Sequence, residues 1–313
     1  MNDLRNARNS TWCIVVADDH GPEWSTAVEP ERVTAPLQYC RFGESSTLLQ
    51  IALRRAASIA PTSQILATLR EDYREHWEFE LRQLRPENRF VSDNRSASLL
   101  ATAAALLSIA AQSPSNIVAV LPTRCYVANP GALSAAIDHG LRLLPGVPEG
   151  VVTLGMLDID AGIDEDCLLI DGEFERQTAA VRGLARRPVA WVAHHLKQQG
   201  ALVASGILIG YAGVFAAHIS RHWPGLTLKL AQLAADASTA GVESEIPCVL
   251  QRGAPSPALR FLRWHPPSLP QRAIRVRRCG WSGLKSPGSA ARIGAVIDGG
   301  HSRSARIAAT TAL

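Results

Sequence analysis

Residues 116–122 read NIVAVLP, and this stretch decides the fold. It is apolar almost throughout, which is typical of a strand buried on both faces of a parallel sheet. Residues 12–17 (WCIVVA) and 150–156 (GVVTLGM) have the same character. Residues 129–144 start with an Asn cap and a first-turn Pro, a pattern that predicts a helix. Strands that alternate with helices predict an α/β fold with a mostly parallel sheet, flanked by helices and connected by right-handed crossovers.

The spacing of apolar residues predicts the remaining elements. Helices are expected at 45–60, capped by Ser45 or Ser46, at 70–84 as a charged amphipathic helix, and at 96–112 as a largely buried one. Strands are expected at 64–69, at 89–92, at 188–196 and, half-exposed, at 272–281. Residues 197–230 predict a helix, a strand and a second helix.

One main domain accounts for most of the 313 residues, of which 47% are hydrophobic and 19% charged. We expect a disordered tail at 1–11, the main domain at 12–230 and its C-terminal part, a short appendage, at 231–297. A second disordered tail follows at 298–313. The hydrophobic and charged fractions of the sequence are typical of a soluble globular protein.

The six cysteines show no CxxC pair, so the sequence predicts neither a zinc site nor a dense disulfide framework. Scattered reduced thiols and a polar start without a signal peptide predict a cytoplasmic protein. The uncharged stretch 201–217 is shorter than the roughly 20 apolar residues of a membrane span. A buried strand and a buried helix are expected there instead.

Several landmarks occur in a characteristic order: TLLQIALRRA (47–56), Asn94-Arg95, VAVLP (118–122), VVTLGM (151–156), Ser205-Gly206 and CGWS (279–282). In this order the chain, over about residues 12–297, resembles the nucleotide-sugar pyrophosphorylases, and the mannose-1-phosphate guanylyltransferase branch most closely. The resemblance implies a Rossmann-like nucleotidyltransferase fold. It also implies transfer of a nucleotidyl group from an NTP to a sugar 1-phosphate, with release of pyrophosphate.

The resemblance aligns the family's glycine-rich phosphate loop with DDHGPEW, residues 18–24. Gly21 is kept, but Glu23 stands where an arginine would neutralise phosphate, and Pro22 removes an N–H donor. Asp18 and Asp19 replace the first two glycines. Carboxylates beside a triphosphate are repulsive unless a cation intervenes.

Other chemical positions of the family are also altered. Leu37, in PLQ, replaces the phosphate-contacting lysine, and no lysine occurs before Lys197. Arg124 and Gly283 replace the two aspartates that bind the metal. Magnesium usually needs one or two carboxylates, so the sequence predicts no metal site and no cofactor, with Mg²⁺ required only if the protein is active.

The candidate residues for binding a nucleotide or substrate are Gly21, Asn94, Arg95, His194, His195, Lys197, Ser205 and Gly206. Each candidate has a plainer alternative. Asn94 is as consistent with a helix cap as with base recognition. His194 and His195, aligned with the family's EKP, are expected to be part-exposed side chains with no special role, the alternative being contact with a sugar phosphate. Arg124 could contact phosphate directly or pair with a local acid. Cys125 could be a reactive thiol or a buried inert one.

Two functions follow from these residues. The first is a family member without catalysis, at most a binding protein for a nucleotide, a sugar phosphate or a protein partner that the sequence does not identify. The second is an active sugar-1-phosphate nucleotidyltransferase with a rebuilt site. GTP or a sugar phosphate is the expected ligand, bound weakly. Nucleic acid is not expected as a partner, because the arginines at 272–278 have no aromatic platform beside them. A membrane is not expected either, because the stretch 201–217 is too short to span one.

Overall fold

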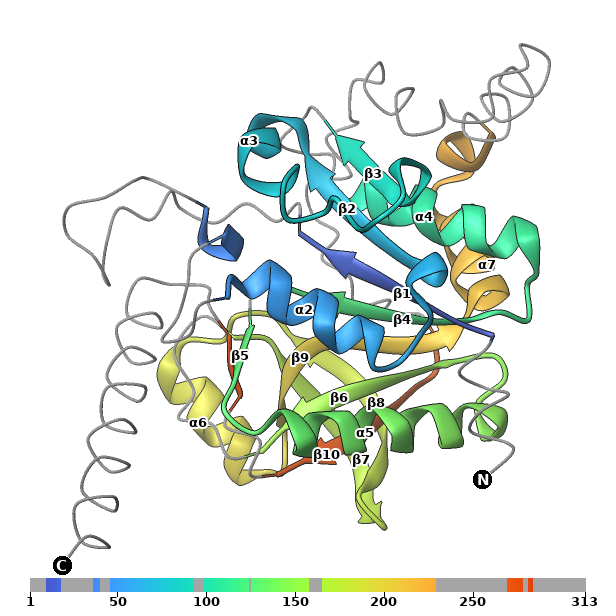
Figure 1. Ribbon diagram of the computed structural model, residues 1–313. Helices are drawn as coiled ribbons and strands as arrows, with labels where there is room; N and C mark the ends of the chain where they lie inside the picture. Colours follow the sequence, from blue (N-terminus) through green and yellow to red (C-terminus); the bar gives the residue numbers. More distant parts are fainter. Residues whose placement is uncertain are drawn as a thin grey trace, which may run out of the picture.

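The strand expected at 116–122 is β4 (Ile117–Pro122), and it lies inside a nine-stranded sheet. The computed structural model describes residues 10–17, 36–39, 46–92, 98–123, 125–157, 165–228, 269–277 and 281–283. The strand order is β3-β2-β1-β4-β9-β6-β10-β8-β7, with helices on both faces of the sheet (Figure 1). An α/β fold is therefore confirmed.

One half of the sheet is parallel. It contains β3 (Arg89–Ser92), β2 (Ile65–Arg70), β1 (Thr11–Val16) and β4. All neighbouring pairs in this half are parallel, and Val15 lies between Ala67 and Leu121 in the register. Apolar strands buried on both faces and joined by helices give this arrangement, as the sequence predicts.

The other half is mainly antiparallel. Its strands are β9 (Leu202–Tyr211), β6 (Val151–Met156), β10 (Gln271–Val276), β8 (Thr178–Ala185) and β7 (Cys167–Glu175). Strand β9 is antiparallel to β4, β6 and β7, and its pairing with β7 closes this half into a barrel-like ring. The sheet is mixed, which corrects the prediction of a mostly parallel one.

The β7–β8 hairpin accounts for much of this difference. Its turn residues Arg176 and Gln177 have φ values of 48° and 84°. Neither is a glycine, the residue that usually marks a turn with positive φ, so little in the sequence indicates a hairpin. Strand β7 also continues into exposed polar residues beyond Ile170, which hides its apolar pattern.

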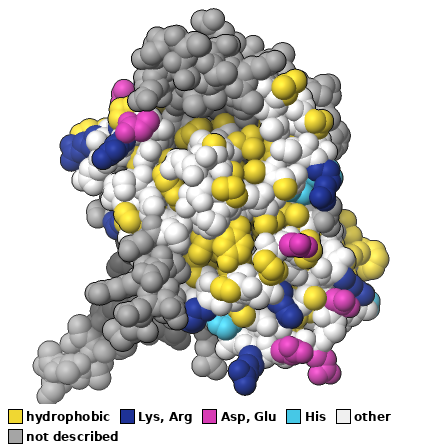
Figure 2. All heavy atoms as spheres, turned by 90° about the vertical axis from the view of Figure 1, so that its right-hand side faces the viewer, with side chains coloured by type: hydrophobic (Ala, Val, Ile, Leu, Met, Phe, Trp, Pro, Cys, Tyr) yellow, Lys and Arg dark blue, Asp and Glu magenta, His cyan; other side chains and the backbone are white. Residues whose placement is uncertain are grey.

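Two helical layers enclose the sheet. On one face, α2 (Leu48–Ala57) and α5 (Pro130–Leu143) contribute to a core that includes Val15, Leu49 and Leu133. On the opposite face, α4 (Ser98–Gln112) and α7 (Ala212–His222) cover Ile14 and Val120. Seen from the side of α4 and α7, apolar side chains occupy the middle of the surface and charged side chains lie toward its margins (Figure 2).

Shorter elements complete the described chain. A second, two-stranded sheet pairs β5 (Cys125–Val127) with β11 (Trp281–Gly283). The short 3-10 helices are η1 (Leu37–Tyr39), η2 (Thr62–Gln64), η3 (Glu71–Tyr73), η4 (Pro86–Asn88) and η5 (Leu144–Gly146). Within the described ranges, no helix has the length and apolar character needed to cross a membrane.

The cap of α2 differs from the predicted one. The N-cap is Thr47, not Ser45 or Ser46, and its hydroxyl accepts a hydrogen bond from the backbone N–H of Gln50. The Gln50 side chain accepts in return from the Thr47 N–H, which completes a capping box. The hydroxyl of Ser46 instead accepts a bond from Arg54 at 2.8 Å.

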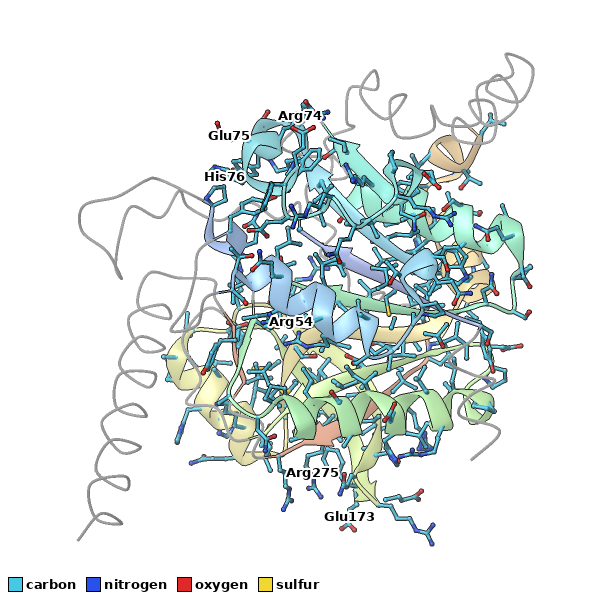
Figure 3. All side chains as sticks on the ribbon, in the orientation of Figure 1. Arg54, Arg74, Glu75, His76, Glu173 and Arg275 are labelled. Carbon is cyan, nitrogen blue, oxygen red and sulfur yellow. The ribbon has the colours of Figure 1, made fainter. Side chains whose placement is uncertain are left out.

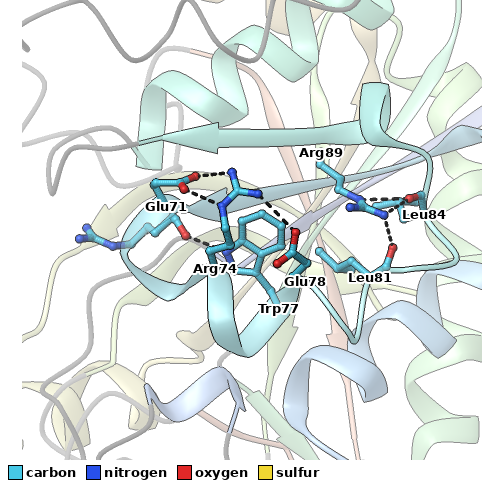
Figure 4. Close-up of polar contacts among 8 residues, drawn as sticks. Glu71, Arg74, Trp77, Glu78, Leu81, Leu84 and Arg89 are labelled. Carbon is cyan, nitrogen blue, oxygen red and sulfur yellow. Dashed lines mark hydrogen bonds and ion pairs between the residues drawn. The ribbon is translucent and has the colours of Figure 1, made fainter.

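The helix predicted at 70–84 is reduced to η3 and the single turn of α3 (Arg74–Trp77). Figure 4 shows the reason, because the guanidinium of Arg89 donates to the carbonyl oxygens of Leu81, at 2.8 Å, and Leu84. The Trp77 indole N–H donates to the Arg70 carbonyl at 2.7 Å. A helix starting at residue 70 would have paired the Arg70 carbonyl with the Arg74 N–H, and Trp77 supplies that donor instead.

The strand predicted at 188–196 is a helix, α6 (Ala190–Gln198). Ala193 and Leu196, three positions apart, pack toward Cys167 of β7, whereas Trp191 is 74% exposed. The apolar residues of this segment therefore lie on one face of a helix, with an exposed tryptophan beside them. The prediction of a strand at 188–196 is wrong.

The sequence predicts a half-exposed β10, but this strand lies between β6 and β8, and Ala273, Ile274 and Val276 are buried. The guanidinium of Arg275 lies 4.3 Å from the centroid of the Phe174 ring. Burial lowers the pKa of Arg275, and the charge of Arg277 adds to this effect. Figure 3 shows Arg275 and Glu173 near the β7–β8 hairpin.

Replacing Gly155 of β6 tests how closely its backbone packs against Leu202 of β9. A Cβ at Gly155 would lie 2.5 Å from Cδ1 and 2.7 Å from Cβ of Leu202. We expect Gly155→Ala to lower the free energy of unfolding by about 1–3 kcal/mol, as overpacked core positions do. Gly183→Ala is the control, because its Cβ would meet only Leu169 Cδ1, at 3.7 Å. Equal denaturation midpoints for the two variants would contradict this packing.

His218 of α7 should make stability depend on pH. It is 5% exposed, and burial, reinforced by His222 and Arg221, lowers its pKa to about 4. Because an unfolded histidine has a pKa of about 6.5, the unfolded chain binds the proton first as the pH falls. Stability is therefore complete above about pH 6.5 and decreases toward pH 4.

Between about pH 7.5 and pH 5 the free energy of unfolding of the wild type should fall. In His218→Gln this fall should be smaller by about 1–2 kcal/mol. Urea denaturation at both pH values measures this difference. His194→Gln, at an exposed position, is the matched control. An unchanged pH dependence in His218→Gln would show that this imidazole is not the group responsible.

Candidate functional site

The carboxyl ends of β1, β4 and β6 lie at one edge of the sheet. Strands β4 and β6 run the same way because each is antiparallel to β9. Thr123, which follows β4, donates from its N–H and its hydroxyl to the Val16 carbonyl at 3.1 and 2.9 Å. Leu157, which follows β6, donates from its N–H to Val276 at 3.2 Å. The sequence predicts this shared edge, where ligands of α/β sheets bind.

The PLQ segment lies against the end of β1. Gln38 is 1% exposed, and its side-chain amide donates to the Ala17 carbonyl at 3.0 Å. The other side-chain atom, Gln38 Oε1, is buried and has no hydrogen-bond partner in the described part of the chain. A buried acceptor without a partner is costly, so a further donor beside this carbonyl would be favourable. The sequence alone draws attention only to its neighbour, Leu37.

The β5–β11 pair joins two distant parts of the chain. Gly283 lies opposite Cys125, the residue that follows Arg124. Gly283 is thus paired with the residue next to Arg124 in the chain, and Arg124 itself lies outside the described residues. Gly283 offers no carboxylate, and the described residues contain no group of three His, Cys, Asp or Glu side chains that could hold a metal.

Cys125 is buried at this position, with 2% of its surface exposed. Its thiol donates to the Pro122 carbonyl at 3.6 Å and accepts a hydrogen bond from the Arg55 guanidinium at 3.6 Å. Reactive cysteines are usually partly exposed, so this burial favours the inert alternative.

Ser205 and Gly206 form a bulge in β9. Ser205 is buried, and its hydroxyl donates to the Leu154 carbonyl at 2.7 Å and accepts from the Ile207 N–H at 3.1 Å. Gly206 has a φ of 79°, a conformation that favours glycine, and a Cβ there would lie 3.4 Å from Pro122 Cγ. The bulge therefore reaches the end of β4, and the Ser205 hydroxyl bonds backbone groups of β6 and β9.

The candidates of α6 are differently placed. His194 and His195 are exposed, and their Nε2 atoms lie 3.0 Å from the side-chain amide nitrogens of Gln198 and Gln199. From the sequence, His195 and Lys197 are expected on one face of a strand. In a helix, two such positions differ by about 200°, so they lie on nearly opposite sides. This separation does not support a joint phosphate contact.

Two buried acids at the edge were missed. Glu165 and Asp166, 6% and 4% exposed, precede β7. The Asp166 carbonyl accepts from the Ala204 N–H at 2.8 Å, beside the bulge, and its carboxylate accepts from the Arg187 N–H at 3.1 Å. Their position just before the apolar run CLLI (167–170) was the only sequence signal.

Arg70, at the end of β2, was also missed. It is 2% exposed, forms an ion pair with Asp72, and lies 5.1 Å from the centroid of the Tyr73 ring. Tyr39 stacks on His76 at 5.3 Å next to this group. The remaining sequence candidates lie outside the described residues: Asp18, Asp19, Gly21, Pro22, Glu23, Asn94, Arg95 and Arg124.

This α/β fold, a mixed sheet with a barrel-like half, is shared with several solved structures. The chain is similar to the mannose-1-phosphate geranyltransferase of Thermus thermophilus (TM-score 0.63, 20% identity, 87% of this chain and 75% of that one). It is also similar to the mannose-6-phosphate isomerase of Helicobacter pylori (0.58, 16%, 87% and 99%). A third similar structure is the inositol-1-phosphate CTP transferase of T. maritima (0.53, 12%, 93% and 96%). No protein-family model and no curated protein matches the sequence.

Removing the Ser205 hydroxyl should destabilise the bulge. Ser205→Ala leaves the Leu154 carbonyl and the Ile207 N–H without this partner inside the core. We expect the free energy of unfolding to fall by about 1–3 kcal/mol. Ser58→Ala, which removes an exposed hydroxyl bonded to the Arg55 carbonyl, should change it by less than about 0.5 kcal/mol. A neutral Ser205→Ala would mean that the bulge does not need this hydroxyl.

Proposed function

We propose that this protein has the nucleotidyltransferase fold without its catalysis, and binds a nucleotide or a sugar phosphate weakly at the carboxyl edge. The observation that carries the proposal is the β5–β11 pairing, which sets Gly283 opposite the residue that follows Arg124. Under the family resemblance, both positions would carry metal-binding aspartates. Here one has no side chain and the other is cationic.

The other altered positions support the same conclusion. Phosphoryl-type transfer depends on positioning the reacting groups and on neutralising their charge. Leu37 has no charge, and Glu23 adds a negative one where the resemblance expects a positive one. Two unit charges of like sign about 4 Å apart repel each other by about 4 kcal/mol at an effective dielectric constant of 20. Several such changes together would raise the barrier beyond what one compensating residue could restore.

The expected ligands follow from the similar structures. Their names include mannose 1-phosphate and inositol 1-phosphate, which share a polyhydroxylated ring and a phosphate monoester. We propose this class of ligand, or GTP, for the carboxyl edge. The unpartnered Oε1 of Gln38 offers an acceptor for a hydroxyl or an amino group. We place the protein in the cytoplasm.

The alternative is an active enzyme with a rebuilt site. The observation that favours it is the buried pair Glu165 and Asp166, which supplies carboxylates at the same edge. The Asp166 carboxylate already accepts a bond from Arg187, and Glu165 lies beside it in the chain. This site would use other residues than the family positions do.

Turnover separates the two functions. We expect no nucleotide sugar from wild type supplied with GTP, mannose 1-phosphate and Mg²⁺. A combined variant should gain Mg²⁺-dependent GTP binding in calorimetry, because residues that act as one unit are strongly non-additive. It carries Asp18→Gly, Asp19→Gly, Pro22→Thr, Glu23→Arg, Leu37→Lys, Arg124→Asp and Gly283→Asp.

Single changes provide the controls. Arg124→Asp and Gly283→Asp alone should each fail to create Mg²⁺-dependent binding, since each leaves the other position without a carboxylate. Turnover by wild type would establish the rebuilt enzyme. Its loss on Glu165→Gln would then assign the carboxylate. A folded combined variant that binds no GTP would contradict the alignment of the family positions.

A further inference from the structure

Arg55 carries a charge for which the described structure supplies no counter-ion. It is half-buried on α2, and its NH1 group donates to the Cys125 sulfur at 3.6 Å. No acidic side chain among the described residues lies within ion-pair distance of it. A guanidinium has five N–H donors, and a thiol sulfur is only a weak acceptor. Among the described residues, this sulfur is the one acceptor recorded for the guanidinium, which leaves donors for an anion.

The position of this charge is informative. Residues directly opposite each other in an antiparallel pair place their side chains on the same face. Cys125 and Gly283 are opposite each other, so the Cys125 sulfur marks the face on which a side chain at 283 would begin. Arg55 reaches this sulfur. The guanidinium thus contacts the residue paired with Gly283, at which the family resemblance expects a metal-binding carboxylate.

We propose that Arg55 and the β5–β11 pair form a binding site for a phosphate group that works without a divalent cation. A guanidinium binds phosphate through paired, charge-assisted hydrogen bonds, and the charge that a metal would supply comes here from the protein. The site takes a phosphate monoester or a diphosphate. The inference rests on the proposed function in that it assigns the phosphate part of the same ligand.

The neighbouring arginine gives a matched control. Arg54 is exposed, and its guanidinium donates to the Ser46 hydroxyl at 2.8 Å (Figure 3 labels it on α2). It has the same charge, lies on the same helix, and is one residue away. A general effect of net charge would change both variants equally, whereas a site at the β5–β11 pair would respond only to Arg55.

The test uses inorganic pyrophosphate as the probe, in calorimetry with EDTA present. Wild type should bind it, Arg55→Gln should bind it about tenfold or more weakly, and Arg54→Gln should stay within about twofold of wild type. Circular dichroism and thermal unfolding establish that each variant is folded. Equal affinities for wild type and Arg55→Gln, or binding by wild type only with Mg²⁺, or no binding at all, would each overturn the proposal.

A second variant keeps Arg55 in place. Gly283→Asp adds a carboxylate on the face of the Cys125 sulfur, where it would pair with Arg55 and weaken pyrophosphate binding in EDTA by about tenfold. An unchanged affinity would place the anion elsewhere. GTP and mannose 1-phosphate are titrated in parallel. If pyrophosphate binds through Arg55 but neither GTP nor mannose 1-phosphate binds, the proposed function alone is overturned. If GTP or mannose 1-phosphate binds and Arg55→Gln has no effect, this inference alone is overturned.

Discussion

The hydrogen bond from the Ser205 hydroxyl to the Leu154 carbonyl fixes the point on which the two halves of the sheet depend. Ala204 of β9 pairs with Gly155 of β6, and Leu208 pairs with Thr153. Between these two pairs β9 has more residues than β6, so β9 bulges at this point. The positive φ of Gly206 accommodates the extra residues. One end of β9 then pairs with β4 in the parallel half and the other with β7 in the ring. Without the bulge, a single register would have to serve three partner strands.

The same bulge leads by direct contacts to the candidate site. Gly206 approaches Pro122, the Pro122 carbonyl accepts a bond from the Cys125 thiol, and Cys125 lies opposite Gly283. Arg55 is attached to this series through the Cys125 sulfur. Small residues and a buried hydroxyl therefore hold together segments that are far apart in the sequence. The shape of the carboxyl edge is a property of the fold, and the chemistry at that edge is set separately by the few side chains that face it.

The sequence predicts the parallel half well because burial on both faces leaves an unambiguous signal, as in IVAVLP at β4. The prediction failed where a local contact decided the structure. Arg89 bonds the carbonyls of Leu81 and Leu84, and no periodicity at 70–84 reveals a donor from outside that stretch. At α6, an exposed Trp191 completed a false apolar run. For the site, motif order indicated Gly283 and PLQ, but Arg55 is one arginine among many until β5 and β11 are known to pair.

The charges at the edge explain why the altered positions are coupled. A divalent cation about 6 Å from an unpaired guanidinium would be repelled by about 5 kcal/mol at an effective dielectric constant of 20, which is comparable to the binding energy of a millimolar ligand. Among the described residues Arg55 has no counter-ion, so its charge opposes a metal at the β5–β11 pair. Conversely, a single carboxylate at position 283 would pair with Arg55, so a metal there would need the second carboxylate, at position 124, as well. The site can satisfy a phosphate group through the guanidinium or through a cation, and the described residues favour the guanidinium.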